Sequence, residues 1–103
     1  MSARTLGIVV SRPDDLAAAL AVAAAARAQS IEVGMFFMSD AVAALPDRLA
    51  DLADLAEADC ELVCCASSAH ERGLAELHVG MLLGSQDDHA ALVHRADRVV
   101  AFT

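Results

Sequence analysis

The sequence predicts one α/β domain over residues 1–103, a three-layer sandwich around a mostly parallel, five-stranded sheet of the Rossmann-like or flavodoxin-like kind. Three observations lead there. The chain has 103 residues, which suits one compact domain. Hydrophobic residues make up 57% of it and aromatic residues 3%, which predicts an aliphatic core rich in alanine. Short apolar runs alternate with helical segments, the pattern of right-handed βαβ units in a parallel sheet.

The first half of the pattern is strand, helix, strand. Residues 6–11 form a short β-branched run that ends before Pro13, which is typical of a buried strand. Asp14 or the aspartate after it can cap a helix, and residues 16–29 are rich in alanine, the strongest helix former. Residues 31–38 then form a second apolar strand.

The middle of the chain continues the alternation. A helical region starts near Asp40, is interrupted by Pro46, and has its main part over residues 47–58. Residues 61–65 are a third, short apolar strand, and a helical turn follows over residues 68–72.

The last third adds a fourth strand over residues 79–83, a helix over residues 87–96 and a fifth strand over residues 98–102. The order of the strands does not follow from the sequence. In such sheets, ligands and reactive groups gather at the carboxyl ends of the strands. The segments to inspect therefore follow Ser11, Met38, Cys65, Gly84 and Phe102.

Charge and hydropathy exclude several classes of protein. The net charge is −8 and the chain contains no lysine and no basic run, so we expect no direct binding of nucleic acid. The longest apolar stretch, residues 16–26, is shorter than the roughly 20 residues that a membrane helix needs. The first residues do not resemble a signal peptide either. We therefore expect a cytoplasmic protein that does not enter a membrane.

The patterns for cofactors and metals are incomplete. The three-glycine dinucleotide fingerprint and the Walker motif are both missing. A zincin pattern that begins at His70 lacks its second histidine. Cys60, Cys64, Cys65 and His70 have ligand types that suit zinc, but their spacing matches no usual zinc site. We expect neither a cofactor nor a metal. An odd number of clustered cysteines is typical of free thiols in a reducing compartment.

Cys65 differs from its neighbours in position. Strand alternation places Cys64 and Cys65 on opposite faces, and Cys65 is the last residue of its strand. Ser68 and Glu71 have the spacing of a capping box, which predicts a helix start just after Cys65. The free N–H groups and the dipole there favour thiolate, the nucleophilic form. Cys65 is therefore the candidate catalytic residue, and the alternative is a small, inert core residue.

Residues 65–73 resemble the DsrE/DsrF-like family, which includes the TusD-type sulfur relay subunits. A cysteine follows the third strand, and Arg72-Gly73 keeps the family spacing from Cys65. Residues 33–42 and 84–102 resemble the second strand with its loop and the closing helix and strand of the same family. Ala41 departs from the glycine that often follows the aspartate of that loop.

The resemblance implies a small α/β subunit that forms dimers, trimers or hexamers. In active members the cysteine, here Cys65, accepts sulfane sulfur as a persulfide and passes it on. The partners would be a sulfur donor protein and a sulfur acceptor protein. Arg72 and Gly73 would be structural. Oligomerisation is also expected because a domain this small and apolar has more apolar surface than one core can hide.

Two other functions stay open. Some family members lack the cysteine and serve as assembly partners, and here the contact surface would lie around Met35, Met38 and Met81. A small-ligand or nucleotide site in the crevice at the strand ends is the third possibility. Without lysine or a glycine-rich loop, it would hold phosphate only by arginine and helix N-termini.

Overall fold

The computed structural model describes residues 4–74 and 80–103. These residues form a five-stranded sheet in the order β4-β3-β2-β1-β5, and every neighbouring pair is parallel. The strands are β1 (Thr5–Val10), β2 (Glu32–Phe37), β3 (Glu61–Cys65), β4 (Met81–Gly84) and β5 (Arg98–Phe102). The predicted α/β class with a parallel sheet is confirmed.

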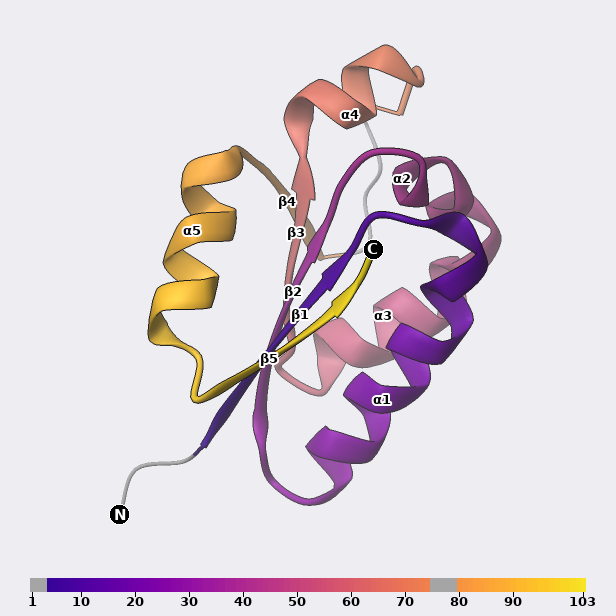
Figure 1. Cartoon of the computed structure of the whole chain (residues 1–103). Helices are drawn as coiled ribbons and strands as arrows, with labels where there is room; N and C mark the ends of the chain where they lie inside the picture. The colour runs from indigo at the N-terminus through magenta and orange to yellow at the C-terminus, as the bar shows by residue number, and fades with distance from the viewer. Residues whose placement is uncertain (1–3, 75–79) are drawn as a thin grey trace.

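Helices cover both faces of this sheet. The α-helices are α1 (Leu16–Ala28), α2 (Ala41–Ala44), α3 (Leu49–Glu57), α4 (Ala66–Glu71) and α5 (Gln86–Arg95), with 3-10 turns η1 (Pro13–Asp15) and η2 (Leu45–Arg48). Figure 1 shows α1 and α3 on one face and α5 on the other, with α4 above the end of β3. The arrangement is the predicted three-layer sandwich.

The strand order explains the placement of these helices. From β1 to β3 the chain moves to the neighbouring strand each time, through α1 and then α3, so right-handed connections put both helices on one face. From β4 the chain returns across the whole sheet to β5, in the opposite direction. The same handedness then puts α5 on the other face.

The observed bounds differ from the prediction in a few places. Pro46 lies in the 3-10 turn η2, because proline lacks the N–H group that an α-helix interior needs, and α3 therefore begins only at Leu49. The fourth strand runs one residue further than predicted, to Gly84, and its predicted first residue, Val79, lies outside the described residues.

The core has two parts, one on each side of the sheet. The larger lies under α1 and α3 and includes Phe37, Leu62 and Cys64. The smaller lies under α5 and consists of Phe36, Val63, Cys65 and Leu92.

Two glycines let α5 lie close to the sheet. A Cβ atom on Gly34 would lie 2.6 Å from Cδ1 of Leu92, and one on Gly7 would lie 3.1 Å from Cβ of Ala96. Glycine at these strand positions thus gives the helix its close approach. None of the helices among residues 4–74 and 80–103 combines the length and the hydropathy that crossing a membrane requires.

Candidate functional site

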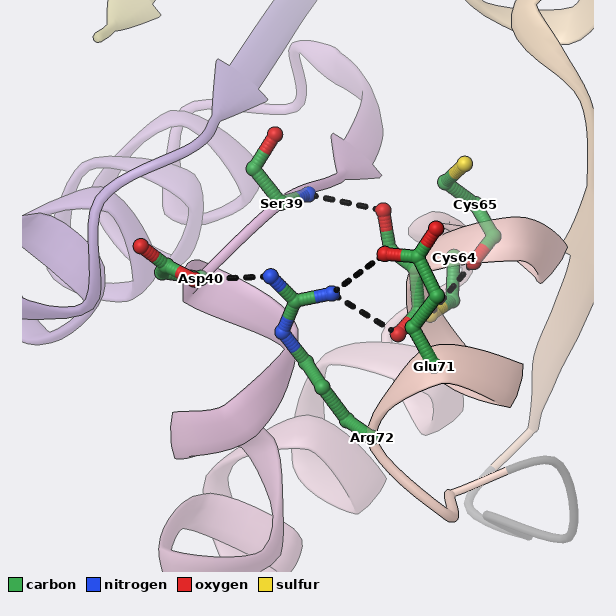
Figure 2. A network of polar contacts seen from close by, with 7 residues as sticks. Ser39, Asp40, Cys64, Cys65, Glu71 and Arg72 are labelled. Atoms are coloured by element: carbon green, nitrogen blue, oxygen red, sulfur yellow. Dashed lines mark hydrogen bonds and ion pairs between the residues drawn. The ribbon is translucent and has the colours of Figure 1, made fainter.

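Cys65 is both the last residue of β3 and the N-cap of α4. Its backbone is extended, with φ −62° and ψ 119°, so the chain passes from strand to helix without an intervening loop. Cys64 belongs to the larger core and Cys65 to the smaller one, which confirms that they lie on opposite faces. In Figure 2 the two thiols point in different directions.

The predicted capping box at the start of α4 is wrong. The helix begins at Ala66, so Ser68 lies inside its first turn and not at its N-cap. The Ser68 hydroxyl instead accepts a hydrogen bond from the backbone N–H of Ser39, at 2.9 Å. Glu71 lies 3.5 Å from Arg72. The Ser68 hydroxyl therefore bonds to the loop after β2 and does not cap α4.

The loop after β2 fixes the position of α4. Nη2 of Arg72 lies 2.7 Å from Oδ1 of Asp40, and Nη1 donates to the carbonyl of Ser68 at 3.0 Å (Figure 2). Ser39 has a left-handed φ of 54°, and its N–H meets the Ser68 hydroxyl. Gly73 follows with φ 69°, a value that glycine adopts without strain. Arg72 and Gly73 thus hold and end the helix that carries Cys65.

Polar groups around the sulfur lower the pKa of Cys65 below its ordinary value of 9.0. Burial is the largest single influence and raises the pKa. The Ser68 hydroxyl, the backbone N–H groups of Ser68 and Ser67, and the Gln86 side chain together outweigh it. The Cys65 side chain makes no capping hydrogen bond to α4.

The other two thiols have the opposite tendency. Burial raises the pKa of Cys64 to about 11, and its S–H donates to the carbonyl of Cys65 at 3.7 Å. Burial also raises the pKa of Cys60, although Arg27 opposes the shift. All three cysteines are free thiols. Only Cys65 combines a position at the carboxyl end of a strand with a shift toward thiolate.

Two residues near Cys65 were given no role by the sequence analysis. Gln86 is the first residue of α5, and its side chain is among the groups that lower the pKa of Cys65. Oε1 of Gln86 lies 2.9 Å from Nδ1 of His89, whose ring stacks on Phe36. The sequence alone shows that Gln86 and His89 are three residues apart. Residues at this spacing face each other on a helix. Their proximity to Cys65 depends on the pairing of β3 with β4.

The residues considered for a zinc site do not come together. Cys64 and Cys65 face opposite sides of the sheet, and His70 is exposed on α4. Within residues 4–74 and 80–103, no cluster of three or more histidine, cysteine, aspartate or glutamate side chains could hold a metal ion.

The surface suggested for an assembly subunit is also corrected. Met35 is 1% exposed and belongs to the larger core, while Met38 and Met81 are only partly buried. Met35 points to the face that α1 covers, so it cannot be part of a contact surface. The exposed large apolar side chains lie elsewhere, with Leu82 and Leu83 on β4 and Val99 and Val100 on β5.

Comparison with known proteins supports the resemblance seen in the sequence. The model of the DsrE/DsrF-like family matches residues 5–102, nearly the whole chain. A comparison with curated proteins found no significant match.

Proposed function

Because the chain belongs to the DsrE/DsrF-like family, we propose that it carries sulfane sulfur as a persulfide on Cys65 and passes it to a partner protein. The observation that carries this proposal is the contrast among the three thiols. Cys65 has a lowered pKa at the carboxyl end of its strand, and Cys60 and Cys64 have raised ones. A lowered pKa increases the share of thiolate at a given pH, and the thiolate is the nucleophile.

The reaction is an exchange between thiols and persulfides without net oxidation. The Cys65 thiolate attacks the outer sulfur of a donor persulfide, R–S–SH, and forms an S–S bond to it. The donor S–S bond breaks and its electron pair leaves with the donor thiolate, RS⁻. Cys65 then holds Cys–S–SH. An acceptor thiolate attacks the outer sulfur in turn and regenerates the Cys65 thiolate.

The same donors serve both forms of the side chain. Cys65 as a whole residue is 8% exposed. A bound sulfane sulfur extends the side chain by one S–S bond of about 2 Å. The inner sulfur becomes the leaving group in the second transfer, and the Ser67 and Ser68 N–H groups that lower its pKa stabilise the charge it regains. No separate acid or base is needed.

The proposal extends to partners, assembly and location. The donor and the acceptor are proteins that bear persulfide and thiol groups, and the chain works as a homo-oligomer. Exposed Leu82 and Leu83 on one edge of the sheet and Val99 and Val100 on the other suit contacts between subunits. Three free thiols suit a reducing, cytoplasmic location.

The second candidate function is a non-catalytic assembly subunit. Two observations favour it: Cys65 is 8% exposed, and both edge strands carry exposed apolar side chains. In that case Cys65 would only fill the smaller core beside Phe36 and Val63. The lowered pKa of Cys65 speaks against this reading, because apolar burial alone would raise it.

The test is intact-protein mass spectrometry after incubation with sodium tetrasulfide, on wild type, Cys64→Ser and Cys65→Ser. We expect wild type and Cys64→Ser to gain sulfur that a mild reductant removes, and Cys65→Ser to gain none. Circular dichroism shows whether each variant is folded. Sulfur on folded Cys65→Ser, or none on folded wild type, contradicts the proposal, and the second result favours the assembly subunit.

A further inference from the structure

The start of α5 lies beside the end of β3, although the two are far apart in the sequence. Cys65 pairs with Gly84, the last residue of β4. Ser85 then caps α5 with a complete capping box, and Gln86 is the first helical residue. The capped helix therefore begins within two residues of the cysteine's partner in the sheet. Gln86 on this side and Ser68 on α4 are both among the groups that lower the pKa of Cys65.

His89 holds the Gln86 side chain. It lies three residues further along α5, and its Nδ1 is 2.9 Å from Oε1 of Gln86. The His89 ring stacks on Phe36 with a centroid distance of 5.1 Å and an interplanar angle of 14°. Phe36 is 1% exposed and shares the smaller core with Cys65. His89 is thus fixed to the same apolar layer that holds the sulfur.

This contact is compatible with one direction of the carboxamide. A glutamine side chain has an acceptor oxygen at one end and a donor NH₂ at the other. With the oxygen end on His89, the NH₂ end is left for Cys65. A thiolate can only accept hydrogen bonds, so the inference requires the His89 tautomer that carries its proton on Nδ1. Each group in the chain His89, Gln86, Cys65 then has the partner that its chemistry requires.

We propose that Gln86 donates from its amide group to the anionic sulfur of Cys65, and that His89 is the positioning residue that orients Gln86. The role in sulfur transfer rests on the proposed function. The stabilisation of the Cys65 thiolate does not rest on that function, because the pKa of Cys65 can be measured without any sulfur donor.

Several charged side chains near the start of α5 and in and after α4 are paired with other groups. Asp88 on α5 accepts from the backbone N–H of Ser85 at 2.8 Å, within the capping box. Glu71 on α4 is paired with Arg72, and Arg72 with Asp40. The remaining titratable side chains of α4 and the first turns of α5 are those of His70, Asp87 and His89. Arg72 is engaged by carboxylates, and the groups that lower the pKa of Cys65 are amide and hydroxyl groups.

The test is the pH dependence of iodoacetamide alkylation at Cys65, followed by peptide mass spectrometry. Gln86→Met keeps a similar length without the donor, and we expect alkylation near neutral pH to slow by about tenfold, with the pKa of Cys65 raised by about one unit. Gln86→Glu adds a negative charge and should raise the pKa of Cys65 further. Gln29→Glu, which changes the chain's other glutamine at the C-cap of α1, is the matched control and should leave the profile unchanged.

His89→Phe separates positioning from packing. The phenyl ring can still stack on Phe36 but cannot hold the Gln86 oxygen, so we expect a shift in the same direction as for Gln86→Met, and smaller. His94→Phe, at an exposed position of the same helix, is its control. A wild-type profile in folded Gln86→Met overturns the role of Gln86, and a wild-type profile in folded His89→Phe overturns the role of His89.

The same variants distinguish this inference from the proposed function. If wild type takes up sulfur from tetrasulfide and Gln86→Met leaves the alkylation profile unchanged, only this inference is overturned. Wild type that takes up no sulfur, with a profile that shifts in Gln86→Met, overturns the sulfur carrier and supports Gln86 as the donor to the thiolate.

Discussion

Adjacent cysteines on one strand acquire opposite acid–base behaviour from their surroundings. Cys64 points into the larger core, where burial raises its pKa to about 11. Cys65 points to the other face, where hydroxyl, amide and backbone donors outweigh the effect of burial. The positions differ by one residue, so strand alternation gives each thiol a different face, and the end of the strand adds the first turn of α4 beside Cys65.

Because the pKa of Cys64 is raised, the free energy of unfolding should fall at alkaline pH. Its folded value, about 11, is above the ordinary value of 9.0, so the unfolded chain loses this proton first. The contribution of Cys64 is therefore complete below pH 9 and is lost as the pH rises from 9 toward 11. Urea unfolding should show about 2 kcal/mol lost at ~pH 10.5. Cys64→Ala should lack this part of the loss, and an equal loss in that variant would contradict the assignment.

At the scale of the elements, α5 depends on the glycines beneath it. Leu92 is 4% exposed and lies over Gly34, where a Cβ atom would come within 2.6 Å of its Cδ1 and 2.9 Å of Nη2 of Arg95. We expect Gly34→Ala to lower the free energy of unfolding by about 1–3 kcal/mol, because the added methyl group pushes the helix outward. Urea unfolding measures it. Gly7→Ala, with a nearest contact of 3.1 Å, should cost less, and the reverse order would contradict this account.

The elements themselves follow closely from the sequence, because their signals are local. Strand runs and helical periodicity gave β3 and β5 with their observed bounds. The start of α4 did not follow, since Ser68 bonds to Ser39, a residue from another loop. A local pattern cannot show that a distant N–H group will take the capping hydroxyl. For the same reason, the role of Cys65 could be suggested from its strand end, while Gln86 required the pairing of β3 with β4.

On the scale of the whole molecule, both edge strands carry exposed apolar side chains. Leu82 is 64% exposed and Leu83 43% on β4, while Val99 is 40% and Val100 37% on β5. Parallel edges with free backbone groups and apolar side chains are surfaces that proteins usually cover.

If the proposed homo-oligomer uses the β4 edge, a charge there should break it. We expect Leu82→Asp to lower the mass measured by light scattering coupled to size-exclusion chromatography. Leu49→Asp is the control, since Leu49 is 40% exposed on α3 and lies away from that edge. An unchanged mass in folded Leu82→Asp would place the contact elsewhere, and a wild-type protein of monomeric mass would contradict the oligomer.

The last helix links the two ends of β3. Its first turn carries Gln86, one of the groups that lower the pKa of Cys65, and in its last turn Arg95 donates to Glu61, at the opposite end of β3, at 3.0 Å. Ten residues of α-helix make a rod of about 15 Å, and the chain leaves this rod for β5 at the far edge (Figure 1). Both ends of this rod lie beside β3, so the helix stiffens the strand that ends in the thiol.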